Sequence, residues 1–275
     1  MAGASVGGVL RRRVLLDSRD GAGLEVSEVT CPGEAGPDDH ARRGAWSAEE
    51  AVGPPAVVVL VRRGVFQRRV EGVETVLDAA TGYVQRSGEV ERFAHPAGGD
   101  VCTSIRLPDE VLDRLWHSPV LPIGPAVDLA HRRLHAAVAA DRPAPVRADL
   151  ANELVAALVP GPPVGPDRRA RTAAAQVRLA LAEAPGTSLT ALAAAVGFSP
   201  WYLSRLFHRA TGSTISRYRA QLRARAVLDA LAGPERTSLA GLAAAHGYAD
   251  QAHLTRDLRQ QTGMTPTALR AMLTS

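Results

Sequence analysis

The sequence predicts an α+β protein of two domains, in which short strands come first and helices follow. Three observations lead to this prediction. Residues 24–107 contain short apolar runs separated by glycines, which is typical of a barrel or a sandwich. Residues 160–166 (PGPPVGP) can continue neither a helix nor a strand and predict a stiff linker. Residues 188–263 contain one helical pattern twice, and 275 residues are long enough for two domains.

The strand-rich part is expected to follow a flexible arm at residues 1–22, which is rich in Gly, Ala, Arg and Asp. The expected strands are residues 24–30, 56–61, 65–70, 74–78, 82–85, 91–94 and 101–107. Helices expected at residues 109–117, 125–140 and 146–159 complete a first domain over residues 23–159. The apolar stripes of these helices can pack within the chain or against a second copy, and the sequence leaves both open.

A helix marked at both ends is the clearest local signal in the chain. Ser199 can cap the first free backbone N–H groups, Pro200 suits the first helical position, and Gly212 suits the left-handed residue after a helix. Helical spacing places four apolar side chains on one face: Leu203, Leu206, Phe207 and Ala210. Another face carries Trp201, Ser204, Arg205 and His208. A small-residue helix and a turn with Gly197 precede it, so the pair forms a helix-turn-helix pattern.

The same pattern then returns. Residues 238–248 match residues 188–198 at an offset of 50, and residues 250–256 match residues 199–205 at an offset of 51, after one inserted residue. The equivalent positions hold a cap, two inner apolar side chains and a final glycine: Asp250, Leu254, Leu258 and Gly263. A whole repeated supersecondary pattern is difficult to obtain by chance.

Residues 172–273 resemble the DNA-binding domain of the AraC family of transcription regulators. The matching motifs are Ser188-Leu-x-x-Leu-Ala, Gly197-Phe-Ser-Pro, Leu203-Ser-Arg-x-Phe, Gly247-Tyr, Leu254-Thr-Arg and Gly263-Met-Thr-Pro. The resemblance implies an all-α domain over residues 167–275. It begins with a helix at residues 168–184, and a long helix at residues 216–232 joins two helix-turn-helix motifs that enter successive major-groove turns.

The resemblance also implies the DNA-binding residues. They are Trp201, Ser204, Arg205 and His208 in the first motif, and Gln251, His253, Thr255 and Arg256 in the second. Ala252 is a poor base reader, and Asp257 puts a carboxylate where the first motif has Leu206. The second motif is therefore expected to bind more weakly or to read less sequence.

A second resemblance concerns the strands. The runs at residues 58–61, 64–66 and 95–103 are similar to the cupin-like sensor half of some AraC-family regulators. The His-x-His motif followed by Glu of cupin metal sites is absent, so an enzymatic cupin is not expected. The resemblance implies a domain that senses a small-molecule effector or mediates dimerisation.

The charge distribution favours a nucleic-acid partner. Residues 165–275 contain 14 Arg against 6 acidic residues, a net charge of +8, whereas residues 1–164 contain 18 Arg against 22 acidic residues, a net charge of −4. A basic domain joined to a mildly acidic one is typical of a DNA-binding protein with an added function. The expected partner is double-stranded DNA. RNA polymerase, an unknown effector and a second copy of the chain are further candidate partners.

Several other classes are not favoured. The sequence has no Gly-rich phosphate loop, metalloprotease helix or nucleophile elbow, so we expect neither an enzyme nor a cofactor. Two cysteines cannot build a disulfide scaffold, and no apolar run is long enough to span a membrane, so a cytoplasmic location is expected. The alternative function is a small-molecule-binding or enzymatic cupin-like barrel with a helical appendage, which leaves the repeated motif unexplained.

One group of side chains has the ligand types that zinc prefers: Cys31, His40, His95 and Cys102. Their spacing in the sequence is irregular, and free cysteines are commonly buried as small apolar residues. The sequence therefore favours a purely structural role and leaves a metal or redox site open.

Overall fold

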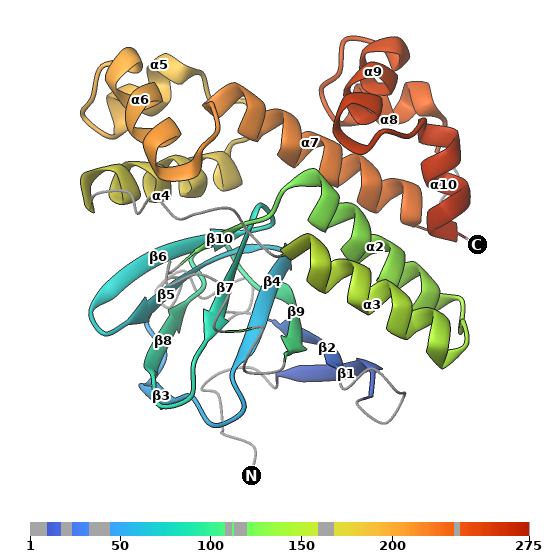
Figure 1. Cartoon of the computed structure of the whole chain (residues 1–275). Coiled ribbons are helices and arrows are strands. Elements are labelled where there is room, and N and C mark those ends of the chain that lie inside the picture. The colour runs from blue at the N-terminus through green and yellow to red at the C-terminus, as the bar shows by residue number, and fades with distance from the viewer. Residues whose placement is uncertain are drawn as a thin grey trace. The chain divides into compact units, whose positions relative to one another are not determined.

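The computed structural model describes residues 10–17, 24–32, 45–107, 112, 120–158, 168–233 and 237–274. The chain divides into two compact units. The first unit holds all the strands together with helices α4–α6, and the second holds α2, α3 and α7–α10. The β-rich N-terminal region and the helical C-terminal region confirm the α+β class (Figure 1).

The strands form two antiparallel sheets in the first unit (Figure 1). One sheet has the order β1-β2-β9-β4-β7-β10 and the other the order β3-β8-β5-β6. The strands are β1 (Arg11–Leu16), β2 (Glu25–Cys31), β3 (Glu50–Ala51), β4 (Val57–Arg63), β5 (Val65–Val70), β6 (Val73–Asp78), β7 (Thr81–Gln85), β8 (Val90–Ala94), β9 (Asp100–Arg106) and β10 (Leu121–Pro122). Their shared core draws Val59, Tyr83 and Cys102 from the first sheet, and Phe66 and Leu77 from the second. The sheets therefore pack face to face, as in double-sheet β folds.

The seven strands expected from the sequence are present as β2 and β4–β9, within a few residues at each end. The expected flexible arm is wrong for residues 11–16, which pair with β2 as β1. Leu15 and Leu16 are each only 1% exposed, so this short apolar end anchors a strand whose arginines face solvent. Residues 1–9 and 18–22 of that arm lie outside the described residues.

The helices of the second unit are α2 (Pro125–Ala139), α3 (Ala144–Leu158), α7 (Ile215–Ala232), α8 (Leu239–Ala245), α9 (Gln251–Thr262) and α10 (Pro266–Thr274). Those of the first unit are α4 (Arg168–Glu183), α5 (Leu189–Ala195) and α6 (Pro200–Thr211). The expected helix at residues 109–117 and the linker at residues 160–166 fall outside the described residues, apart from Leu112. In the part of the chain that is described, no helix combines the length and the apolar character needed to cross a membrane.

Helix α4 packs on the β region within the first unit. The Arg178 Nη1 donates to the backbone oxygen of Val76 at 3.2 Å, and its Nε lies 3.6 Å from Asp78 Oδ2. These contacts join residues on both sides of the linker at residues 160–166. The division into domains at that linker therefore remains a prediction, because the compact units do not follow it.

Four charged side chains join α2 to α7 within the second unit. Arg132 Nη1 lies 2.5 Å from Asp229 Oδ1, and its Nε lies 3.2 Å from Asp128 Oδ2. The Arg225 Nη2 donates to the backbone oxygen of Ile123 at 2.6 Å, and its Nε lies 3.5 Å from Asp128 Oδ1. Burial alone would lower the pKa of Arg132, but the charges of Asp128 and Asp229 outweigh it and raise that pKa. Two buried arginines thus meet two carboxylates, and the charges balance.

Candidate nucleic-acid interface

The pairs α5–α6 and α8–α9 are two copies of one motif, which confirms the repeat. The hydroxyl oxygen of Ser188 accepts a backbone N–H of α5 at 3.1 Å, and that of Ser238 accepts one of α8 at 3.0 Å. The turn after each short helix contains a glycine with a φ of 70°, a left-handed conformation that glycine adopts without strain: Gly197 and Gly247.

The second helix of each copy is also capped alike. Ser199 Oγ accepts a backbone N–H of α6 at 3.3 Å, and Asp250 Oδ1 accepts one of α9 at 2.6 Å. Both helices end at a left-handed glycine, with a φ of 68° at Gly212 and 74° at Gly263. The sequence thus fixes the length and the start of both candidate recognition helices through local capping.

Helix α6 exposes the polar face that its periodicity predicts. Its buried side chains are Leu203, Leu206 and Phe207. Trp201 is 66% exposed, and the guanidinium of Arg205 lies 4.7 Å from the centre of its ring. His208 is exposed as well, whereas the hydroxyl of half-buried Ser204 donates to the backbone oxygen of Pro200 at 2.9 Å. A large aromatic ring left in solvent beside a cation is a surface that suits a nucleic acid.

Helix α9 also presents a polar face to solvent. Its buried side chains are Leu254 and Leu258. Gln251 and Arg256 are exposed, and Thr255 is half-buried. His253 is half-buried too, and its ring packs edge-on against Tyr248 with 5.3 Å between the ring centres. Of the four residues expected to contact DNA here, Gln251 and Arg256 are thus the most accessible.

Asp257 has another role than the sequence suggested. The hydroxyl of Tyr248 donates to its Oδ2 at 2.7 Å, and the amide of Gln261 donates to its Oδ1 at 2.8 Å. The same amide donates to the backbone oxygen of Ala220 on α7 at 3.3 Å. Burial first, and then Asp257, raises the pKa of Tyr248, so that hydroxyl stays a donor. The carboxylate therefore ties α9 to its own motif.

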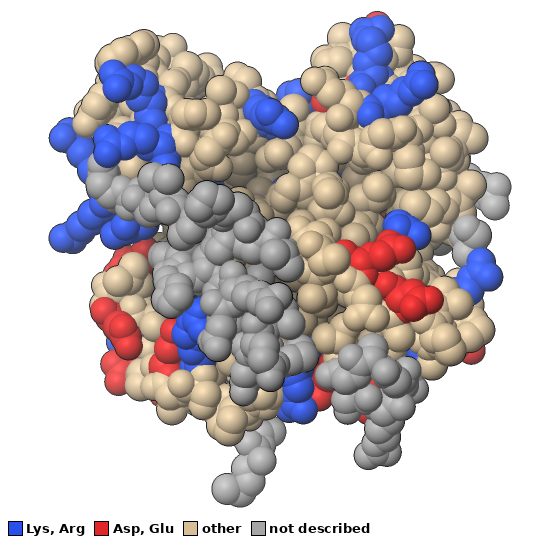
Figure 2. All heavy atoms as spheres, viewed as in Figure 1, with Lys and Arg blue, Asp and Glu red and all other residues tan. Residues whose placement is uncertain are grey.

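Arg259 is a candidate contact that the sequence interpretation missed. It is exposed in the last turn of α9, at the offset of 51 from His208 that also relates Arg256 to Arg205. The repeat itself was therefore the signal that could have found it. Figure 2 shows arginine side chains on the surface of both helix-turn-helix motifs.

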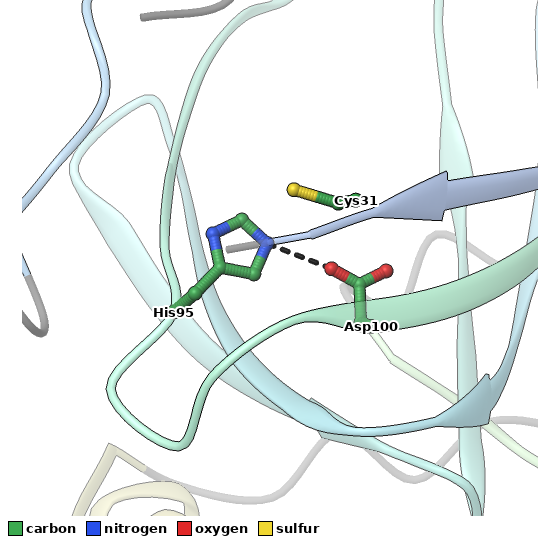
Figure 3. A group of neighbouring side chains, drawn as sticks. All are labelled: Cys31, His95 and Asp100. Carbon is green, nitrogen blue, oxygen red and sulfur yellow. Dashed lines mark ion pairs between the residues drawn. The ribbon is translucent and has the colours of Figure 1, made fainter. Parts of the chain in front are cut away.

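Of the four residues whose types suit zinc, the structure brings Cys31 and His95 together. Cys31, His95 and a third residue, Asp100, place one ligand atom each within 4.8 Å of one another (Figure 3). His95 Nε2 lies 2.7 Å from Asp100 Oδ1, and the buried Cys102 thiol donates to Asp100 Oδ2 at 3.0 Å. Burial lowers the pKa of His95, but its bonds and charges with Asp100 and Cys31 raise it to about 10 overall. His40 lies outside the described residues.

Comparison with known proteins identifies one domain. Residues 192–272 match a family model described as a helix-turn-helix domain. No curated protein sequence matches the chain. Among solved structures, the chain is similar to fatty-acid-bound ToxT from Vibrio cholerae, with 9% identity, 91% of this chain and 96% of that chain covered, and a TM-score of 0.35.

Two further structures are similar to about a third of the chain. A cupin-2 domain protein from Shewanella frigidimarina has 15% identity, covers 36% of this chain and 80% of its own, and gives a TM-score of 0.27. A protein of unknown function from Listeria innocua has 26% identity, covers 35% and 92%, and gives a TM-score of 0.32. At such TM-scores these likenesses add nothing to the assignment, which rests on the family model.

The family model and the local structure agree on the same residues. Residues 192–272 run from within α5 to within α10, and they include both capped helices and the long helix α7 between the motifs. Both helices bury an apolar stripe and leave a polar face in solvent. Residues 192–272 therefore form a helix-turn-helix domain with two copies of the motif.

Proposed function

We propose that the chain is a sequence-specific transcription regulator that reads two successive major-groove segments of double-stranded DNA with α6 and α9. The observation that carries this proposal is the repeated capped helix with its polar face in solvent. Major-groove base edges present donors and acceptors that Arg and Gln side chains recognise in pairs. A net charge of +8 over residues 165–275 supplies the attraction to phosphates.

The two helices present different side chains to DNA in this proposal. Arg205, stacked on Trp201, presents a planar guanidinium that suits guanine or a phosphate. Gln251 suits adenine, and Arg256 and Arg259 provide cations along α9. His253 packs against its own motif, so it is less available to bases than the exposed Gln251 and Arg256 of the same helix.

The β region is the proposed site of regulation. We propose that it senses a small-molecule effector or mediates a homodimer, that the protein acts in the cytoplasm, and that RNA polymerase is its partner at the promoter. Two antiparallel sheets around one apolar core support a binding module, and we propose no catalytic activity. An enzymatic barrel with a helical appendage would leave the two capped motifs and the basic charge unexplained.

Footprinting with the full chain tests the proposal. The DNA upstream of its own gene is the first target, and the expected result is protection of two segments about one helical turn apart, roughly 34 Å along the axis. The logarithm of the binding constant should fall linearly with the logarithm of salt concentration, because phosphate neutralisation releases counterions.

Matched arginine variants provide the control. Arg205→Ala and Arg256→Ala should weaken the footprint, whereas Arg133→Ala removes the same charge from α2 and should leave it intact. Arg133 is 39% exposed and pairs with Glu153, far in sequence from either recognition helix. Uniform protection of any DNA, with equal losses in all three variants, would contradict sequence-specific recognition.

A further inference from the structure

The strand register brings a sulfur and a carboxylate together in the first compact unit. Cys31 at the end of β2 pairs directly with Asp100 at the start of β9. Directly paired residues on antiparallel strands project from the same face of the sheet, so the two side chains lie next to each other. His95 comes from the turn after β8, which closes by a 3.3 Å hydrogen bond from the Gly98 N–H to the His95 backbone oxygen. Figure 3 shows the imidazole turned toward both other side chains.

Two glycines allow the backbone to close tightly around these side chains. A Cβ added at Gly99 would lie 2.4 Å from the backbone oxygen of Cys31. A Cβ added at Gly64, whose φ is +88°, would lie 2.5 Å from the backbone oxygen of Gly99 and 2.9 Å from the Cα of Asp100. No side chain larger than hydrogen fits at either position without a shift of the backbone. The positions of Cys31 and Asp100 are therefore set by the strands rather than by flexible loops.

The imidazole of His95 is largely buried beside Asp100 and Cys31. Its side chain is 10% exposed and its ring centre lies 5.6 Å from that of Phe66. Nε2 bonds Asp100, but the buried Nδ1 has no hydrogen-bond partner among the described residues. A buried polar group that serves structure alone normally has its hydrogen bonds satisfied. A purely structural role leaves this half-satisfied ring unexplained.

We propose that Cys31 Sγ, a ring nitrogen of His95 and an Asp100 carboxylate oxygen form a zinc site. Sulfur, imidazole nitrogen and carboxylate oxygen are the three ligand types of zinc, and their distances in tetrahedral coordination are roughly 3.3–3.8 Å. The three atoms already lie within 4.8 Å of one another, so small side-chain rotations suffice. Three protein ligands leave the fourth position to water or an exogenous ligand. A thiolate and an imidazole do not suit Mg²⁺ or Ca²⁺, which prefer oxygen.

A disulfide between Cys31 and Cys102 is a poorer use of the same residues. Cys102 pairs with Val29, two residues from Cys31, so the two cysteines are diagonal neighbours on adjacent strands. Diagonal Cα atoms lie about 7–8 Å apart, beyond the range of about 4.4–6.8 Å that a disulfide spans. The Cys102 thiol instead donates a hydrogen bond to Asp100 and orients that carboxylate.

Metal analysis of the full-length protein tests the site. The purified chain, stripped with a chelator and reloaded with Zn²⁺, should retain about one zinc per chain after desalting. Co²⁺ in place of Zn²⁺ should give a thiolate-to-metal charge-transfer band. Cys31→Ser should abolish that band, whereas Cys102→Ala should keep it, because the second sulfur is not a ligand. Asp100→Asn should weaken zinc affinity about 10–100-fold.

The outcomes are decisive in both directions. Circular dichroism confirms that each variant is folded before metal is measured, and His95→Gln provides a second ligand variant if Cys31→Ser fails to fold. Wild-type protein that retains no zinc, or a cobalt band that survives Cys31→Ser, would overturn the proposal. A band lost in Cys102→Ala but kept in Cys31→Ser would do the same. None of these measurements depends on DNA binding.

Discussion

Arg205 and Arg256 occupy the same position in the two copies of the motif, and both side chains are exposed. Arg205→Ala should cost about 1–3 kcal/mol of specific binding and relax selectivity at the bases beside it. Arg256→Ala should reduce base selectivity less than Arg205→Ala does. The neighbouring Ala252 has no polar group that could contact a base, and Arg259 still supplies a cation. Binding to a panel of operators with single-base changes measures both effects. Equal losses across the panel for both variants would mean that the two arginines only hold phosphates.

Asp257 provides a prediction about stability rather than recognition. Asp257→Ala leaves the hydroxyl of Tyr248 and the amide of Gln261 without their acceptor, so unfolding should become easier by about 1–3 kcal/mol. Affinity for DNA should not increase. Urea denaturation and a binding titration measure the two quantities side by side. A gain in affinity at unchanged stability would show that the carboxylate faces the phosphates.

At this scale, periodicity predicted which side chains of α6 and α9 lie outside, because the apolar stripe must be buried. It could not predict that the ring of Tyr248 packs against His253 and that its hydroxyl bonds Asp257. Tyr248 lies in the turn before α9, outside the periodic pattern of that helix. Periodicity also could not find Asp100 beside Cys31, because only the pairing of β2 with β9 brings them together.

At the level of single elements, the left-handed ends of α6 and α9 can be tested directly. Gly212→Ala forces a side chain into a φ of 68°, and the cost should be about 1–2 kcal/mol of stability. No atom lies within 4 Å of the added Cβ, so the penalty is conformational rather than steric. Gly186→Ala is the matched control, because its added Cβ also meets nothing and its φ is not left-handed. Equal melting temperatures for the two variants would exclude a role for this cap.

The charged side chains between α2 and α7 predict a larger effect. Asp128→Ala removes a carboxylate from both buried arginines, Arg132 and Arg225, and should destabilise the protein by about 3–5 kcal/mol. Arg133→Ala breaks only the exposed pair with Glu153, so its effect should stay within about 0–1 kcal/mol. Urea denaturation of both variants distinguishes them, and similar midpoints would mean that the buried charges contribute little.

The elements were predictable wherever local signals coincide. Caps and apolar spacing specified α6 and α9, and turn glycines separated the strands. Strand β1 was missed because three arginines precede its two buried leucines and hide the alternation. The two-residue strands β3 and β10 have no pattern of their own and exist only through pairing with β8 and β7.

For the whole molecule, the expected domain boundary gives a prediction. A fragment of residues 165–275 keeps both motifs and should bind DNA with strong salt dependence. It loses the contacts of Arg178 with the β region and of Arg132 with Asp229, so it should melt at a lower temperature than the full chain. Calorimetry and salt-dependent binding measure this. A fragment that binds no DNA at low salt, while residues 1–164 do, would contradict the assignment of the DNA-binding region.

Helix α7 has a consequence for how tightly an operator is held. It is an unbroken helix of 18 residues that leads from one motif to the next, so the two reading heads are tethered like the arms of a bivalent ligand. Once one motif is bound to DNA, the other is confined to a small volume around its site, so its binding becomes an intramolecular step. Two helix-turn-helix motifs that each bind DNA weakly can then give a long residence time. Weakening the contacts of either motif shortens the lifetime of the whole complex.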